Sequence, residues 1–301
     1  LPFRRCAGKA KPSGEHEMNV ALFSAVSYIY LFSSLAYCGY FFFRVDEVGK
    51  AATGITAAGI FAHTAAYALR WFESYKLGMG HSPLSFFTLY ETIIFACWSL
   101  TLMYLFLEHL FRTRALGIFV LPFISLAMLG ASGSLGMSSR IEALPPVLKG
   151  NVLAYHVTTC MMSLTAFLIA CIAAGLLLLA TKAPGNMPAP AALSNRLPLP
   201  QVLDDICYKA TAVGFILFSM AMATGAYRAK IIWGRYWSWD PVEAGSLIMW
   251  LLYALILHGR YQRWWGGTTG ALLSIAAFAA AICSFLIAAN RLMTSAHYPI
   301  Q

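Results

Sequence analysis

Residues 152–180 read VLAYHVTTCMMSLTAFLIACIAAGLLLLA, a long apolar run without a single Asp, Glu, Lys or Arg. An α-helix needs about 20 predominantly apolar residues to cross a hydrocarbon core about 30 Å thick. A run this long and this apolar therefore predicts a transmembrane helix rather than a core helix of a soluble domain.

Comparable runs occur along the rest of the chain. With this one included, the candidate spans lie near residues 19–43, 51–69, 84–107, 115–131, 152–180, 210–229, 243–259 and 268–290. The longest connection, residues 181–209, is rich in Pro and Ala and is expected to be an extended loop. We therefore predict an all-α fold, a polytopic integral membrane helical bundle of about eight transmembrane helices.

The composition excludes several classes of protein. Of the 301 residues, 59% are hydrophobic and 11% are charged, whereas a soluble domain carries about 25% charged residues. This balance excludes a soluble enzyme, and it excludes a disordered or nucleic-acid-binding chain despite the net charge of +9. The seven cysteines form no C-x-x-C pair, which excludes a thiol redox motif, a zinc knuckle and a covalent haem attachment site.

The predicted membrane domain follows a short polar segment. Residues 1–18 form a polar N-terminal tail, and an apolar run begins directly after Met18. A non-native extension in front of an initiator Met18 and an ordinary tail explain this pattern equally well. We expect residues 19–301 to form a single membrane domain.

A cluster of tryptophans separates the sixth and seventh predicted spans. Trp233, Trp237 and Trp239 are followed at once by Asp240 and Glu243. Tryptophans at a membrane surface commonly form an interfacial belt, but a belt needs only one or two indoles per helix end. Stacked indoles would form a flat apolar platform with N–H donors at its edge. The cluster therefore favours a binding site for a large planar aromatic ligand.

The run W-G-R-Y-W-S-W-D-P-V-E at residues 233–243 resembles the tryptophan-rich signature of a known family. It is similar to the haem-handling subunit of System II cytochrome c synthases, of the CcsA/ResC type. The resemblance covers about residues 60–298, including Leu89-Tyr90-Glu91 and the helix that carries Trp250 and His258. It implies an outward-facing haem-binding loop at residues 230–243 and haem b as the transported ligand.

The resemblance also implies a set of haem-contacting residues. They are Trp233, Arg235, Trp237, Trp239, Asp240, Glu243, Trp250, His156, His258 and His297. Counting crossings puts His156, the tryptophan cluster and His297 on one face of the membrane. Each histidine alone is also explained as an interfacial polar residue, but two imidazoles together can ligate a haem iron from opposite faces. The resemblance agrees, because the family's two external iron ligands bracket the signature in this order.

His258 differs from these two histidines in depth. It follows Glu243 by fifteen residues on one predicted helix, hence about 22 Å further along the axis and near the opposite face. It is explained equally well as a polar residue at a helix end beside Arg260, and the resemblance favours an intramembrane iron ligand. A second intramembrane ligand is not identified; His63 is physically possible, but no motif places it there. Glu91 needs a buried partner, which the sequence does not name.

The charged residues around the signature allow two interpretations. Asp240 and Glu243 either cap the following helix at its positive end or contact haem directly. Arg228, Lys230 and Arg235 crowd the same segment, and a guanidinium can bind a haem propionate with two hydrogen bonds. Lys and Arg are otherwise spread almost evenly over both faces, so they do not fix the orientation.

Together these features predict transport and presentation of haem and its attachment to apocytochrome c. The expected partners are a ResB/CcsB-type membrane subunit, an apocytochrome c bearing C-x-x-C-H, and thiol-reducing proteins. No residue resembles a conventional acid, base or nucleophile, so participation in a cytochrome c synthase (haem lyase) stays open. A System I-type haem exporter or chaperone is the alternative, and a b-type cytochrome subunit of a quinol oxidoreductase is a weaker one. The expected location is the bacterial inner membrane with the site outside, or alternatively the thylakoid membrane.

Overall fold

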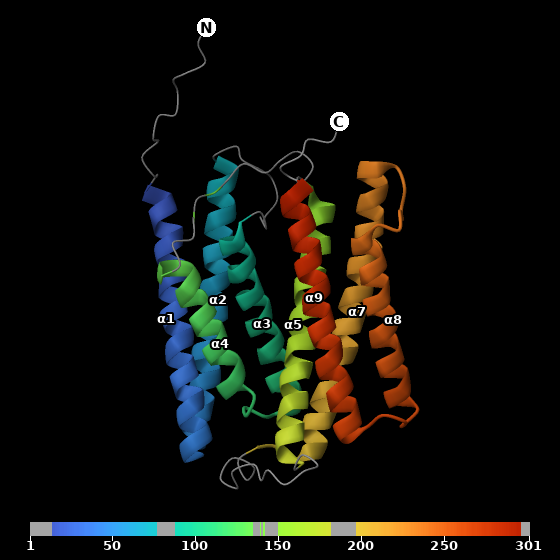
Figure 1. The fold of residues 1–301 in the computed structure, drawn as a ribbon. Coiled ribbons are helices and arrows are strands. Elements are labelled where there is room, and N and C mark those ends of the chain that lie inside the picture. The colour runs from blue at the N-terminus through green and yellow to red at the C-terminus, as the bar shows by residue number, and fades with distance from the viewer. Residues whose placement is uncertain are drawn as a thin grey trace.

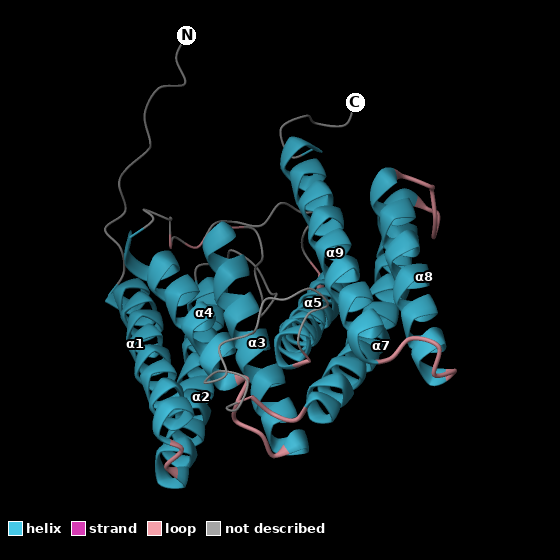
Figure 2. Cartoon of the chain, turned by 60° about the horizontal axis from the view of Figure 1, so that its bottom comes forward, coloured by secondary structure: helices cyan, strands magenta, loops and turns pink. Residues whose placement is uncertain are grey.

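A computed structural model describes residues 14–76, 88–134, 139, 141, 150–181 and 197–295 of the chain. Within these ranges every regular element is helical, in agreement with the predicted all-α fold (Figure 2). The elements are α1 (Gly14–Phe43), α2 (Asp46–Lys76), α3 (Leu89–Phe111), α4 (Gly117–Leu129), the π-helical turn η1 (Gly130–Ser134), α5 (Asn151–Ala180), α7 (Pro200–Trp233), α8 (Pro241–Tyr261) and α9 (Gly267–Ser295).

Each of the eight predicted segments corresponds to one α-helix of the described chain, and six of these helices are long and apolar enough to cross a membrane. The six spans are Val20–Phe43, Leu89–Phe111, Asn151–Ala180, Pro200–Trp233, Pro241–Tyr261 and Gly267–Leu286. Helix α4 has 13 residues and is therefore only about 20 Å long, while α2 carries charged residues at both of its ends. The protein is a helical membrane bundle, and the two remaining helices are less suited to spanning than the sequence indicated.

The expected loop at residues 181–209 is shorter than predicted. Residues 200–209 already form the first turns of α7, with Pro200 at the start of the helix. Leu203, Ile206 and Cys207 are buried at helical spacing, and this burial outweighs the Pro-rich composition that suggested a loop. Residues 182–196 lie outside the described part of the chain.

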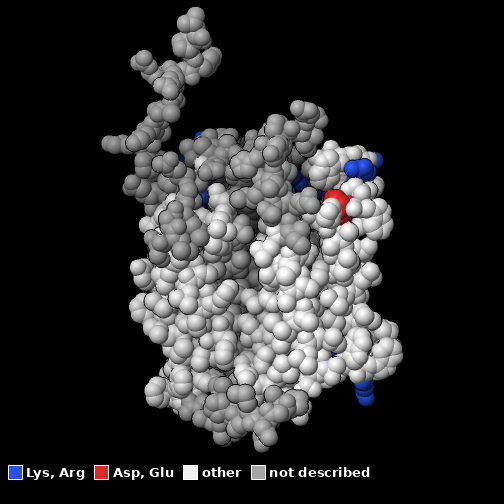
Figure 3. All heavy atoms as spheres, in the orientation of Figure 1, with Lys and Arg blue, Asp and Glu red and all other residues white. Residues whose placement is uncertain are grey.

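Helices that follow one another in the chain run antiparallel, and the helices form two groups (Figure 1). The first group comprises α1 to α4, in which α1 packs on α2 and α4; the second comprises α5, α7, α8 and α9, in which α5 packs along α7. Helix α3 contacts both α4 and α5 and so joins the groups. We call the end at which residues 234–240 connect α7 to α8 the site end. On the face shown in Figure 3, charged atoms gather toward the two ends and leave a band of uncharged residues between them.

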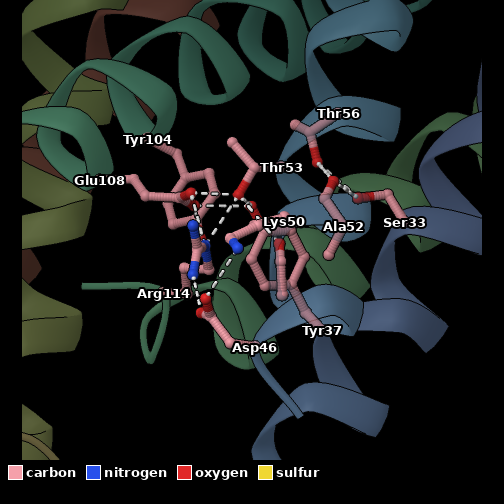
Figure 4. A network of polar contacts seen from close by, with 11 residues as sticks. Ser33, Tyr37, Asp46, Lys50, Ala52, Thr53, Thr56, Tyr104, Glu108 and Arg114 are labelled. Atoms are coloured by element: carbon pink, nitrogen blue, oxygen red, sulfur yellow. Dashed lines mark hydrogen bonds and ion pairs between the residues drawn. The ribbon is translucent and has the colours of Figure 1, made fainter. Parts of the chain in front are cut away.

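A buried carboxylate organises the first group at the end opposite the site end (Figure 4). Glu108 is only 7% exposed and accepts hydrogen bonds from the hydroxyls of Tyr37 (2.6 Å), Tyr104 and Thr53. Arg114 donates to Thr53 and lies 3.7 Å from the Glu108 carboxylate. Because each buried polar group has a partner, this network ties α1, α2 and α3 together.

A second buried pair supplies the partner that Glu91 requires. Its carboxylate lies 2.8 Å from the guanidinium of Arg70 on α2, and both side chains are buried. Glu91 also completes a capping box with Thr88 at the start of α3. Glu91 is thus a structural residue that joins α2 to α3.

His63 is buried in the first group as well. Its Nδ1 lies 3.1 Å from the Tyr30 hydroxyl, and its ring stacks on Tyr67 at 5.4 Å between centroids. Its Nε2 has no hydrogen-bond partner among the described residues. Since His258 belongs to α8 in the other group, the fold does not pair the two histidines.

Candidate functional site

The connection between α7 and α8 is held at both of its ends. Gly234 ends α7 in a left-handed conformation with φ of 75°, and its carbonyl accepts a 2.7 Å hydrogen bond from Lys230. Asp240 caps α8, since its Oδ1 accepts from the backbone N–H groups of Val242 (2.7 Å) and Glu243 (3.0 Å). Pro241 occupies the first helical turn.

Glu243 folds back over the same connection. Its Oε2 accepts hydrogen bonds from the backbone N–H (2.6 Å) and the hydroxyl (3.0 Å) of Ser238. Of the two interpretations of Asp240 and Glu243, the structure therefore shows the structural one. Both carboxylates fix the shape of the loop, and the haem contact predicted for them stays a prediction.

The connection exposes Trp233, Tyr236 and Trp239, whereas Trp237 is half-buried. Trp233 is 57% exposed and Trp239 is 71% exposed. Trp239 also has a φ of 60°, a conformation that costs a non-glycine residue on the order of 1–3 kcal/mol. Capping on one side and the Glu243 contacts on the other maintain this strained conformation.

The indoles do not form the stacked platform that the sequence suggested. The rings of Trp237 and Trp239 are 5.7 Å apart between centroids and meet at 86°, edge to face. This arrangement places the positive edge of one ring toward the negative face of the other. The Nε1 of Trp237 is buried and has no hydrogen-bond partner within the described residues.

The predicted cations lie around this loop. Arg235 is exposed, and Lys230 lies 5.7 Å from the ring centroid of Tyr236. Arg228, two residues before Lys230 on α7, is half-buried. The exposed part of the loop thus combines aromatic surface with positive charge, which suits an aromatic ligand that carries carboxylates.

Trp250 lies away from the loop, about 14 Å along α8 from its start. Its N–H donates a 2.9 Å hydrogen bond to the hydroxyl of Ser219, and its ring contacts Phe215 on α7. The structure therefore gives Trp250 a helix-packing role that the sequence prediction of a haem contact did not include.

His156 lies near the start of α5 and faces α7. Its Nδ1 donates a 2.8 Å hydrogen bond to the carbonyl of Ala221. Its Nε2 lies 3.8 Å from the thiol of Cys160, one turn further along α5. The ring rests against Gly225, about 12 Å along α7 from Trp233.

Of the other two predicted iron ligands, His258 lies within the described residues and His297 does not. His297 lies outside the described residues, but α9 ends at Ser295 at the site end, as the crossing count predicts (Figure 1). His258 lies near the opposite end of α8, exposed and edge-on to Trp264 at 5.7 Å. Beside it, Arg260 pairs with Asp204 on α7 at 2.9 Å.

Sequence reasoning missed several residues that shape the site. Ser238 receives Glu243, and Gly225 and Cys160 contact His156. Only the spacing of His156 and Cys160, four residues apart on one helix, was a visible signal. Across the described part of the chain no three His, Cys, Asp or Glu side chains come together as a metal site. A haem iron needs only two axial side chains.

Comparison with known proteins identifies the class to which this fold and site belong. Residues 86–292 match the family model described as cytochrome C assembly protein, so the chain belongs to that family. The matched region contains α3 to α9 up to its last turn, and so includes the α7–α8 loop, His156 and His258.

Individual relatives show to which type within this family the chain is similar. The chain is 30% identical over 280 residues to the cytochrome c biogenesis protein CcsA of Pyropia yezoensis, covering 81% of this chain and 84% of the relative. It is 29% identical over 296 residues to CcsA of Gloeobacter violaceus, covering 81% and 85%, and 33% identical over 244 residues to CcsA of Prochlorococcus marinus strain NATL2A, covering 72% and 75%. The chain is thus a cytochrome c biogenesis protein of the CcsA type, as the signature implied.

Proposed function

We propose that this protein binds haem at its site end and presents it to an apocytochrome c for covalent attachment. One observation carries the proposal: a loop braced by Asp240 and Glu243 holds Trp233 and Trp239 outward on an end of the bundle that also carries Arg235. Such a surface offers aromatic contact to a porphyrin and positive charge to its propionates.

In this proposal His156 and His297 supply the two axial ligands. Each imidazole donates a nitrogen lone pair to the iron, and the porphyrin lies over the exposed indoles with its vinyl groups accessible. Each cysteine of an apocytochrome C-x-x-C-H motif then adds across one vinyl. Sulfur bonds to one vinyl carbon and the thiol proton goes to the other, so the addition needs no external oxidant or reductant. The protein's contribution is positioning.

The vinyl chemistry in this scheme requires haem b, and the C-x-x-C-H thiols must be reduced. Thiol-reducing proteins are therefore expected partners. Whether thioether formation is this protein's own activity is tested by producing covalent cytochrome c in a reconstituted host. A System I-type exporter would bind haem and give no covalent product.

A partner membrane subunit of the ResB/CcsB type is proposed to cover α8. Ile248, Leu251 and Leu255 form an exposed stripe along α8 that ends at His258. An ionisable side chain at an exposed position of a spanning helix is costly in lipid. A protein partner that covers His258 and supplies a second iron ligand would remove this cost. A b-type cytochrome is less consistent with the fold, because His63 and His258 lie in different helix groups.

The location is proposed to be the bacterial inner membrane, with the site end outside. The Ala- and Gly-rich composition supports a bacterial chain over a plastid-encoded one. Fusion of alkaline phosphatase to residue 301 tests the orientation. Activity of the fusion places the end of α9, and with it the site end, outside; an inactive fusion contradicts the proposed orientation.

The haem proposal is tested with two exposed tryptophans at the same end of the bundle. Trp239→Leu is expected to lower the haem bound per protein and the yield of covalent cytochrome c. Trp71→Leu is the matched control, because Trp71 is 46% exposed near the end of α2 but lies outside the loop. Equal haem binding by wild type and Trp239→Leu, or equal losses in both variants, would contradict a role of the loop in binding haem.

A further inference from the structure

Helix α5 approaches the backbone of α7 at two corresponding points. Ser163 donates to the carbonyl of Gly214 at 2.9 Å, and His156 donates to the carbonyl of Ala221 at 2.8 Å. The two donors are seven residues apart on α5, and the two acceptors are seven residues apart on α7, as expected for antiparallel helices in close contact (Figure 1). His156 is therefore part of a helix interface and not a side chain free to turn in solvent.

Gly225 makes the contact between His156 and the backbone of α7 possible. A Cβ at position 225 would lie 2.9 Å from Cε1 and 3.1 Å from Nδ1 of His156, closer than a Cβ tolerates. Any larger residue would displace the imidazole from α7 and break the hydrogen bond to Ala221. Gly214 plays a comparable steric role for Phe167, which a Cβ there would approach to 2.5 Å.

The hydrogen bond to Ala221 decides which ring nitrogen can bind a metal. A carbonyl oxygen only accepts, so Nδ1 must carry the proton and Nε2 must carry the lone pair. The contact made by Nε2 is with the thiol of Cys160 at 3.8 Å, a weak donor. Histidines that ligate metals ordinarily donate their other ring N–H to a carbonyl or carboxylate, which fixes tautomer and orientation.

We propose that Gly225 and the carbonyl of Ala221 form a seat that positions His156 for iron ligation through Nε2, with Cys160 contacting Nε2 until haem binds. The proposal rests on the proposed function, in which His156 is an axial ligand. Gly225 is a positioning residue and Cys160 makes a contact that competes for Nε2, and neither binds the iron. On ligation the Nε2 lone pair passes from the thiol contact to iron, and the thiol keeps its proton.

The test is Gly225→Ala in the full-length protein, purified with its partner subunit and titrated with ferrous haem b. Displacing an outer-shell contact of a metal ligand lowers affinity by about 10-fold to 100-fold. Haem affinity is expected to fall by that factor, with loss of the low-spin spectrum. Added imidazole is expected to restore the spectrum, because a free base can occupy the position that His156 vacates.

Two glycine variants separate positioning from general packing. Gly214→Ala disturbs the same pair of helices through Phe167 and should lower thermal stability without changing the haem spectrum. Gly175→Ala introduces a methyl group where no atom lies within 4 Å and should behave as wild type. The seat is refuted if Gly225→Ala binds haem as wild type does, or if Gly214→Ala causes the same spectral loss with the same response to imidazole.

A His156→Gly variant distinguishes failure of the seat from failure of the proposed function. If His156→Gly keeps the wild-type spectrum, His156 is not a ligand and the proposed function fails at this residue. If His156→Gly loses the wild-type spectrum while Gly225→Ala keeps it, the proposed seat is wrong but ligation by His156 stands. Cys160→Ala is expected to bind haem at least as tightly as wild type, since the competing contact is gone. Weaker binding by Cys160→Ala would overturn the assignment of Cys160.

Discussion

The two helix groups use their carboxylate side chains in different ways. In the first group carboxylates are buried and satisfied: Glu108 accepts from three hydroxyls, and Glu91 pairs with Arg70. In the second group the half-buried Asp240 and Glu243 use their oxygens to hold a loop on which Trp233 and Trp239 are exposed. Carboxylates thus join helices inside the first group, whereas in the second group they fix the shape of the loop that we propose binds haem.

Removing Glu108 should have the largest effect on stability. Glu108→Ala leaves the hydroxyls of Tyr37 and Tyr104 without their buried acceptor, and each buried donor left unsatisfied costs about 1–3 kcal/mol. Thermal unfolding in detergent measures this loss of stability. The haem bound per folded molecule should be unchanged if the groups divide their roles as described.

The matched control for Glu108→Ala is Glu47→Ala. Glu47 makes a 2.9 Å pair with Lys50, but its side chain is 80% exposed. Exposed pairs contribute only about 0–1 kcal/mol. Equal stability of the two variants would contradict the structural role of the Glu108 network, and loss of haem without loss of stability would contradict the division of roles.

Removing the cap of α8 should have a smaller effect, located at the loop. Asp240→Ala leaves the N–H groups of Val242 and Glu243 without an acceptor, at a cost of about 1 kcal/mol. Haem affinity should fall along with this modest loss of stability, because the strained conformation of Trp239 is no longer held. Asp240→Asn keeps a capping oxygen and should retain most of the affinity; an equal loss in both variants would show that the charge, and not the cap, matters.

Acidification should have the smallest effect on stability, and it should act through Asp46, a carboxylate in the first helix group. The hydrogen bond from Lys50, together with Arg114, holds the pKa of the Asp46 carboxyl below its usual range. A lowered pKa means that the contribution to stability is present at neutral pH and is lost as the pH falls below about 4. Wild type should therefore lose slightly more stability on acidification than Asp46→Asn. An identical pH dependence of the two unfolding temperatures would contradict this contribution.

Local features of the structure were predictable from the sequence. The positions of the helices follow from apolar runs, the cap of α8 follows from Asp240-Pro241, and the depth of His258 follows from its distance along one helix. Each depends on residues close in the chain. The start of α7 was misplaced, because the burial of Leu203 and Ile206 depends on neighbouring helices and not on the Pro-rich composition before them.

Contacts between distant segments were not predictable. Tyr37 is 71 residues from Glu108, and the two meet only through the packing of α1 and α3. The partner of Glu91, the perpendicular indoles and the approach of Gly225 to His156 depend likewise on the geometry of the fold. The signature indicated that a site exists, whereas the structure shows which of its residues brace the loop and which are exposed.

The most direct test of haem binding at the site end is the absorption spectrum of His156→Gly, purified with its partner subunit, with and without imidazole. The account predicts that wild type carries low-spin haem, that the variant loses most of it, and that imidazole restores the spectrum because it replaces the missing ligand. A variant whose spectrum equals that of wild type without imidazole would contradict the account.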